Sequence, residues 1–133
     1  MLSPECLGEL RSAWLPNLTD AGLQRLLDLL EKGSPLLIHG CFTRAIPMGC
    51  LASHAAWHHP ATARLTIDAG ITWLHRVAGL NPATSRVLRE WDSRGASDLA
   101  LRADLVAELR AERQARAARQ PGSAEAARPL VTT

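Results

Sequence analysis

The sequence predicts an all-α fold: a single compact bundle of five to six short helices with a helical C-terminal extension. One observation is that apolar residues recur at the helical spacing i, i+3, i+4 and i+7 along most of the chain. Another is that helix-starting residues precede these segments and glycine follows two of them. The third is a shortage of β-branched runs, so that Leu36-Leu37-Ile38 indicates a short extended piece or buried connector and no sheet.

The first two helices are predicted from local signals. Ser3 can accept hydrogen bonds from free backbone donors and the proline after it needs no donor, so a helix is expected from about Pro4 to Trp14. Thr19-Asp20 begins the second helix, and Gly33 supplies a left-handed end. The leucines that share its apolar face are Leu23, Leu26, Leu27 and Leu30.

The next two helices are predicted around two prolines. Pro47 can open a third helix that ends near His59, because Pro60 disfavours helical geometry in the residue before it. A fourth helix is expected from about Thr62 to Ala78, with Gly79 as its C-terminal stop. The stripe that this helix is expected to turn to the core consists of Ile67, Ile71, Leu74 and Ala78.

Two further helices complete the predicted bundle. The fifth begins at Asn81-Pro82 and runs to about Asp92, and the sixth is capped by Ser97. Their apolar stripes are Val87, Leu88 and Trp91 in one and Leu101, Leu105, Val106 and Leu109 in the other. On the exposed side of the sixth helix, i, i+4 ion pairs are expected between Asp98 and Arg102 and between Glu112 and Arg116.

The C-terminal part of the chain has a different composition. Beyond Leu109 there is no large apolar residue before Leu130. The segment from Ala111 to Arg119 is therefore expected to be a solvated helical extension, and the tail that begins at Gln120-Pro121 cannot bury enough surface to order itself alone. The sequence predicts a helical domain over residues 1–110 and an extension with a flexible tail over residues 111–133.

Composition limits the class of protein. A chain of 133 residues that is 47% hydrophobic can build one core. The formal net charge of +2 favours no strong field for nucleic acid. Three cysteines cannot all pair within the chain, and the first residues lack a secretory signal. The longest run of large aliphatic residues, Leu36-Leu37-Ile38, is far below the roughly 20 residues of a membrane span. We therefore expect a soluble cytoplasmic protein with no membrane role.

The densest group of reactive side chains lies between His39 and His59, where four of the five histidines and two of the three cysteines occur. Cys50, His54 and His58 fall at i, i+4 and i+8 and stack along one face of the predicted third helix. Cys41 and His39 from the preceding loop would complete a tetrahedral ligand set. Because zinc accepts mixed sulfur and nitrogen ligands, these five residues predict a divalent metal site, zinc for example, with a structural or regulatory role.

The same residues have two other interpretations. Cys41 or Cys50 beside a histidine could act as an activated thiolate, although no thiol-hydrolase signature surrounds them and an orienting acid such as Asp68 or Asp92 would have to come from elsewhere. Alternatively, they are a small buried thiol and histidines that bond to backbone carbonyls, since cysteine is among the most often buried residues. Whether the protein is an enzyme is left open.

Residues 74–88, Leu-His-Arg-Val-Ala-Gly-Leu-Asn-Pro-Ala-Thr-Ser-Arg-Val-Leu, form a third candidate site. Over these fifteen residues the chain resembles the helix-turn-helix of LacI-type repressors, with one departure: no valine stands between Thr84 and Ser85, which rotates the second helix by about 100°. The resemblance implies that Thr84, Ser85, Arg86 and Arg89 contact bases and phosphates. An ordinary corner between two helices accounts for the same residues, because Gly79 can stop one helix and Asn81 can cap the next.

Taken together, these patterns give one leading hypothesis and two alternatives. The leading one is a small helical binding protein whose Cys/His segment, residues 39–59, holds a divalent metal. The first alternative is a metal-free protein-interaction module or homo-oligomer that uses the Trp91 to Arg119 region or the corner at Gly79. The second alternative is a DNA-binding protein centred on residues 74–91.

Overall fold

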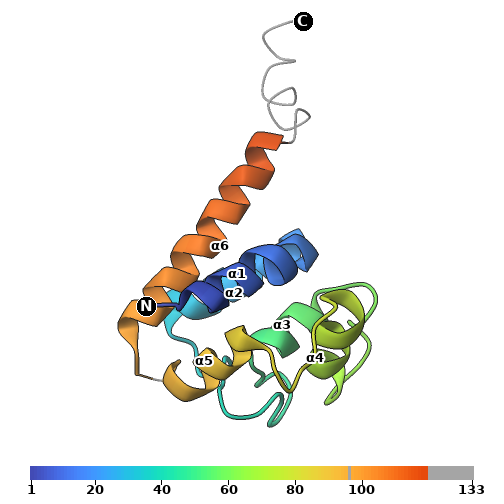
Figure 1. Cartoon of the computed structure of the whole chain (residues 1–133). Coiled ribbons are helices and arrows are strands. Elements are labelled where there is room, and N and C mark those ends of the chain that lie inside the picture. Colours follow the sequence, from blue (N-terminus) through green and yellow to red (C-terminus); the bar gives the residue numbers. More distant parts are fainter. Residues whose placement is uncertain (96, 120–133) are drawn as a thin grey trace, which may run out of the picture.

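The computed structural model describes residues 1–95 and 97–119, and these residues are all-helical (Figure 1). Six α-helices account for the architecture, and no strand occurs in the described part of the chain. Two isolated bridges occur in the loop between α2 and α3, and both involve Gly49, which pairs with Leu37 and with Thr43. The all-α prediction is therefore confirmed.

The N-terminal helix begins where the sequence predicts. Helix α1 spans Pro4–Glu9 and continues as a π-helical turn, Leu10–Trp14, and a 3-10 turn, Leu15–Asn17. Ser3 caps it, because its Oγ accepts a hydrogen bond from the backbone N–H of Cys6 at 3.1 Å.

Helix α2 matches its prediction at both ends. It spans Asp20–Lys32, and Oγ1 of Thr19 accepts from the backbone N–H of Gly22 at 3.0 Å. Gly33 ends the helix with φ of 60°, a left-handed conformation that suits glycine. The predicted leucine face is buried in the core.

Helix α3 is shorter than predicted, spanning Leu51–Trp57 instead of beginning at Pro47. The backbone of Gly49 is paired with residues 36–38: its N–H donates to Leu36 at 3.0 Å, and its carbonyl accepts from Ile38 at 2.9 Å. Because these groups are engaged outside any helix, the helix can begin only after Cys50. Pro47 lies in the preceding loop, after a cis peptide bond.

Helix α4 also starts later than predicted, and its predicted apolar stripe is only partly correct: Leu74 is buried and Ala78 packs against the core, but the two isoleucines are not buried. It spans Ala69–Thr72 and continues as a π-helical turn, Trp73–Val77. Ile67 is 66% exposed and Ile71 is 43% exposed, whereas the inward face carries Ala69, Gly70, Trp73 and Leu74. A Cβ added at Gly70 would lie 2.8 Å from Oγ of Ser53, so the small residues are needed where α4 approaches α3.

Helices α5 and α6 begin after their predicted starts. Helix α5 spans Arg86–Arg94 with Ser85 as its cap, and Asn81 instead accepts a hydrogen bond from the N–H of Ala83 in the preceding turn. Helix α6 spans Leu99–Arg119, and the carboxylate of Asp98, not the hydroxyl of Ser97, accepts from the N–H of Leu101 at 2.9 Å. The predicted partner of Asp98 is also wrong: Asp98 pairs with Arg94 at 3.2 Å.

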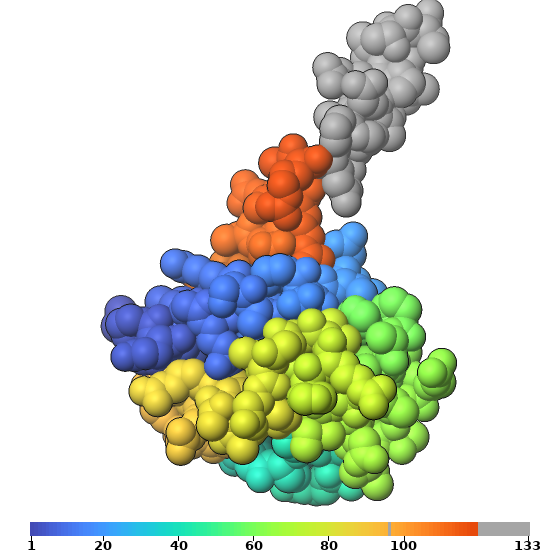
Figure 2. Space-filling model, turned by 45° about the vertical axis from the view of Figure 1, so that its right-hand side comes forward, coloured from blue at the N-terminus to red at the C-terminus, as the bar shows by residue number. Residues whose placement is uncertain are grey.

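The core lies where all these helices meet. Trp14 and Trp73 pack against each other in a tilted arrangement with ring centroids 5.2 Å apart, and Trp91 donates its indole N–H to the carbonyl of Ile38 at 2.8 Å. Figure 1 shows α6 leaving this body, with its C-terminal turns extending away from α3, α4 and α5. In the space-filling view, the N-terminal part of the chain lies between α6 on one side and α5 with the segment before it on the other (Figure 2).

Candidate functional site

The structure contradicts the predicted metal site. Within residues 1–95 and 97–119, no group of three or more His, Cys, Asp or Glu side chains is arranged to hold a metal ion. Of the five predicted ligands, Cys50 and His54 are buried in the protein, His58 is half-buried, and Cys41 and His39 are exposed in the loop. The row at i, i+4, i+8 fails because α3 ends at Trp57, so that His58 has left the helix.

His54 and His58 both form hydrogen bonds with the backbone. Nε2–H of His54 donates to the carbonyl of Leu36 at 2.8 Å, and Nδ1–H of His58 donates to the carbonyl of His54 at 3.0 Å. A nitrogen that donates a proton to a carbonyl has no lone pair for a metal. The structural interpretation, histidines that bond to backbone carbonyls, therefore describes these two residues.

Cys50 is poorly suited to attack a dissolved substrate as a first nucleophile. Its side chain is 2% exposed, and burial raises the pKa of its thiol from 9.0 to about 11. The thiolate is the reactive form of cysteine, and a pKa this high keeps the thiol protonated at neutral pH. The thiol lies 3.9 Å from Oγ of Ser53 inside the protein.

The burial of His54 leads to a prediction on acid stability. Desolvation lowers the pKa of His54 below the 6.5 of an exposed histidine, so the unfolded chain binds this proton more readily than the folded protein does. The contribution of the neutral, buried His54 to stability is therefore fully present above pH 6.5. It is lost as the pH falls from 6.5 towards the lower pKa of the folded protein. Chemical unfolding at pH 7.5 and pH 5.5 should show this loss in the wild type.

Two substitutions isolate the contribution of this histidine. His54→Gln removes the titrating group and should make the stability difference between the two pH values smaller. His75→Gln is the matched control, because His75 is exposed on the π-helical turn that follows α4, and this change should leave the difference unchanged. An equal pH response in wild type and His54→Gln would show that the buried imidazole is not its source.

In the segment that resembles a helix-turn-helix, the carboxylate of Glu9 occupies the hydrogen-bond donors at the start of α5. Glu9 accepts hydrogen bonds through Oε1 from the N–H of Arg86 at 2.8 Å and through Oε2 from Oγ of Ser85 at 2.6 Å and from the N–H of Val87 at 3.1 Å. Trp14 Nε1 donates to the same Oε2 at 3.0 Å. The first turn of α5, which would approach phosphates in a repressor, is thus already occupied by an anion. Ser85 is 1% exposed, so the expectation that it contacts bases is wrong.

Another surface feature is the seam between α2 and α6. The two helices run antiparallel, since Arg116 near the end of α6 pairs with Asp20 at the start of α2 at 2.9 Å, and Arg110 pairs with Glu31 near the end of α2. Two hollows follow this seam. The larger, of about 620 Å³, lies between the end of α2 and the first half of α6, and the other, of about 430 Å³, lies between the start of α2 and the last turns of α6.

Both hollows lie on one side of α6. The residues that line them recur in steps of three and four, which places them on a single helix face: Leu99, Ala103, Val106, Arg110, Arg113 and Ala117. Along α6 this face extends for about 27 Å at roughly 1.5 Å per residue. We call this surface the α2/α6 seam; on the α2 side it includes Gln24, Leu30 and Glu31.

Apolar groups at the seam are open to solvent. Leu99 is 79% exposed, the highest exposure among the large hydrophobic residues of the described chain. Val106 is half-buried beside it, and Ala103 and Ala107 are small and exposed. An exposed leucine next to small residues on a helix face leaves space for another element to approach closely.

The seam also carries an excess of positive charge. Its cations are Lys32, Arg102, Arg110, Arg113 and Arg116, and its carboxylates are Glu31 and Asp20. The two carboxylates pair with Arg110 and Arg116. Arg113 donates to the neutral amide of Gln24 at 3.0 Å, and the guanidinium of Arg102 lies 5.2 Å from the ring centroid of Trp91. Neither of these contacts neutralises the charge.

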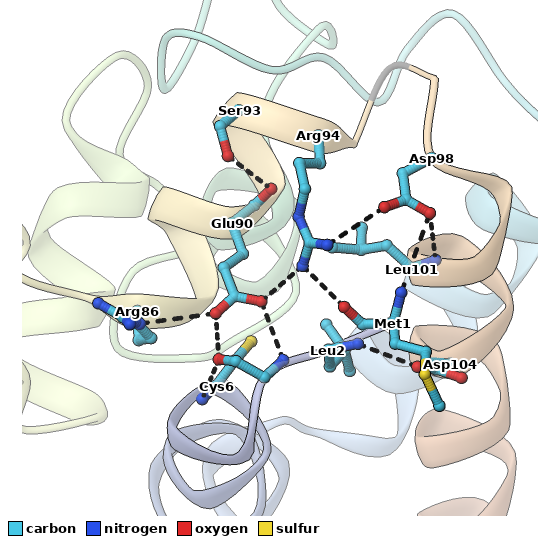
Figure 3. A network of polar contacts seen from close by, with 11 residues as sticks. Met1, Leu2, Cys6, Arg86, Glu90, Ser93, Arg94, Asp98, Leu101 and Asp104 are labelled. Atoms are coloured by element: carbon cyan, nitrogen blue, oxygen red, sulfur yellow. Dashed lines mark hydrogen bonds and ion pairs between the residues drawn. The ribbon is translucent and has the colours of Figure 1, made fainter.

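A polar network holds the start of α6 in place (Figure 3). Arg94 lies at its centre and donates to Glu90 at 2.8 Å, to Asp98 at 3.2 Å and to the carbonyl of Met1 at 2.7 Å. Glu90 in turn accepts from the N–H of Ser3 at 3.1 Å. Burial raises the pKa of Glu90, but hydrogen bonds from Ser3 and Arg94 outweigh this and hold the pKa below its ordinary value. The network fixes the position at which α6 begins, and therefore where Leu99 is presented.

The sequence indicated the Trp91 to Arg119 region as an alternative interaction surface, but it did not predict that this region lies along α2. It also placed Val106 in the core stripe. The signal was nevertheless present, since Leu99, Ala103 and Val106 recur at i, i+4 and i+7 beside the buried stripe of Leu101, Leu105 and Leu109.

Comparisons with family models, with curated proteins and with solved structures each gave no match to this chain. Among the described residues, no helix has both the length and the apolar character needed to cross a membrane. The functional conclusion therefore depends on the surface of the molecule itself.

Proposed function

We propose that the protein is an interaction module that binds an amphipathic helix of a partner protein along the α2/α6 seam. The observation that carries the proposal is the exposed Leu99 at one end of a continuous apolar and basic helix face. Two antiparallel helices with hollows along their junction provide the geometry into which a third helix packs.

The charge of the seam indicates the kind of partner. Cations exceed carboxylates along it, and Arg113 contributes a charge whose described partner is a neutral amide. Complementary charge favours association and suppresses wrong partners. The partner helix is therefore amphipathic, with an apolar stripe for Leu99 and Val106 and acidic residues on either side of that stripe.

The same charge distribution disfavours a second copy of this chain as the occupant. In a symmetric dimer the seam of one copy would face the seam of the other, because such interfaces use the same patch twice. The surplus of arginine and lysine would then face itself, and like charges brought together at an interface are unfavourable.

A set of designed peptides tests the proposal. Three helices of about 20 residues share one leucine stripe and carry glutamate, glutamine or lysine at the flanking positions. We expect the glutamate helix to bind the isotopically labelled protein saturably and to shift the amide resonances of Leu99, Ala103 and Val106. Its affinity should exceed that of the lysine helix by about tenfold or more, and salt should reduce the difference.

Matched variants locate the binding site. Leu99→Glu should weaken binding of the glutamate helix by about tenfold or more, because burying a leucine side chain contributes about 1.5–3 kcal/mol. Leu99 is exposed at the first position of α6, where glutamate suits the helix dipole, so the fold should be retained. Ile67→Glu changes another exposed aliphatic residue away from the seam and should have no effect.

Four outcomes would contradict the proposal. These are no saturable binding, equal binding of the three peptides, shifts confined to residues outside the seam, and equal weakening by Leu99→Glu and Ile67→Glu. A concentration-dependent dimer of the free protein that Leu99→Glu abolishes would show that the occupant is a second copy instead.

A further inference from the structure

Two of the three cysteines line one small pocket on the side of the molecule where the loop after α2 meets α3 and α5. The pocket has a volume of about 100 Å³ and is lined by Gly40, Cys41, Phe42, Cys50, Leu88 and Asp92. Cys41 and Cys50 therefore face the same small space.

Backbone contacts hold the two cysteines at this pocket. The carbonyl of Phe42 accepts hydrogen bonds from the N–H of Cys50 at 2.8 Å and from Oγ of Ser53 at 2.7 Å. Oγ1 of Thr43 lies 3.1 Å from the same serine oxygen. The segment that follows Cys41 is therefore attached to the first turn of α3, directly beside Cys50.

The other side of the pocket is fixed by α5. Oδ1 of Asp92 accepts a hydrogen bond from the N–H of Gly40 at 2.9 Å. This contact joins the residue before Cys41 to α5, while Leu88 from the same helix is buried at 6% exposure. The thiol-bearing loop is thus held from both directions, by α3 and by α5.

The two thiols differ in their access to solvent. Cys41 is exposed and can meet a dissolved oxidant, whereas Cys50 is 2% exposed. Burial raises the pKa of the Cys50 thiol, and the negative charge of Asp92 adds to the effect. Cys41 is therefore the thiol that reacts first, and Cys50 is positioned to react with the product.

We propose that Cys41 and Cys50 form a reversible intramolecular disulfide when the protein meets a hydroperoxide. The sulfur of Cys41 attacks the terminal oxygen of the hydroperoxide; an S–O bond forms, the O–O bond breaks and an alcohol, or water from hydrogen peroxide, leaves. The sulfur of Cys50 then attacks the sulfenic acid at Cys41; the S–S bond forms and the S–O bond breaks. The departing hydroxide takes the Cys50 proton as water, so two thiols are oxidised and one hydroperoxide is reduced.

Stoichiometric oxidation of the full chain tests this pairing. The reduced protein is treated with one equivalent of hydrogen peroxide, and the products are digested without reductant and mapped by mass spectrometry. We expect a peptide that links Cys41 to Cys50, with a loss of two hydrogen atoms from the intact mass, and full recovery of both thiols after dithiothreitol.

Single-cysteine variants supply the controls. Cys6→Ala should retain the linkage, because Cys6 is buried on α1 and does not line this pocket. Cys50→Ser should leave a sulfenic acid on Cys41 that a dimedone probe traps, and Cys41→Ser should leave Cys50 unmodified. Dimers linked through Cys41, oxidation of Cys41 beyond the sulfenic acid in wild type, or a linkage that includes Cys6 would each overturn the proposal.

Discussion

Glu9→Ala is expected to lower the free energy of unfolding by about 3 kcal/mol or more. The carboxylate accepts four hydrogen bonds, from the indole of Trp14, the hydroxyl of Ser85 and the N–H groups of Arg86 and Val87. Hydrogen bonds to a charged group contribute about 1.5–3 kcal/mol each, and donors left without an acceptor in the interior add a penalty. Trp14 and Ser85 are both 1% exposed, so water cannot replace the lost acceptor.

A second acidic residue of α1 provides the control. Glu5→Ala makes the same chemical change on an exposed position of the helix, and urea unfolding should show a change of less than about 0.5 kcal/mol. The Glu9→Ala, Ser85→Ala double variant should lose less stability than the sum of the single variants, because the two side chains share a hydrogen bond. Additive losses, or equal losses in Glu5→Ala and Glu9→Ala, would contradict the role assigned to Glu9.

Gly70→Ala is expected to destabilise the protein by about 2–3 kcal/mol. An added Cβ would lie 2.8 Å from Oγ of Ser53, 2.9 Å from the backbone nitrogen of the same residue and 2.9 Å from the ring of Phe42. Backbone cannot move aside as a side-chain end can, so α4 would have to separate from α3. Overpacking of this kind typically costs about 1–3 kcal/mol.

The matched control is another helical glycine. Gly8→Ala places its Cβ in open space on α1, and alanine is favoured over glycine in a helix interior by roughly 0.5–1 kcal/mol. Thermal unfolding should therefore move the two variants in opposite directions. A melting temperature of Gly70→Ala equal to that of wild type would show that α3 and α4 are less closely packed than the structure indicates.

The helices that were predicted well are those whose ends depend on neighbouring residues. Thr19 and Gly33 act on α2 through bonds within a few positions, and both ends of that helix were predicted correctly. Gly49 shows the opposite case, because its backbone bonds to Leu36 and Ile38, more than ten positions away. No local pattern contains that pairing, and the start of α3 was therefore misplaced.

The candidate sites also differ in whether they depend on neighbouring residues or on residues far apart in the chain. The Cys/His segment is dense in the sequence, but convergence on an ion requires side chains to point at one place, and His54 instead bonds to Leu36 across the core. The α2/α6 seam depends on two helices that are far apart in the chain. The two helices are joined by an ion pair between Arg110 and Glu31, and the sequence around either residue does not identify its partner.

The amino-acid order by itself determined the helical class, the buried leucine face of α2 and the apolar stripe of α6, because apolar periodicity and capping act within one or two turns. Only the tertiary structure decided which face of α4 turns inward, that Glu9 closes the start of α5, and that Leu99 is left open to solvent. The physical reason is that burial and carboxylate pairing depend on which segments come together in space, and spacing along the chain does not carry that information.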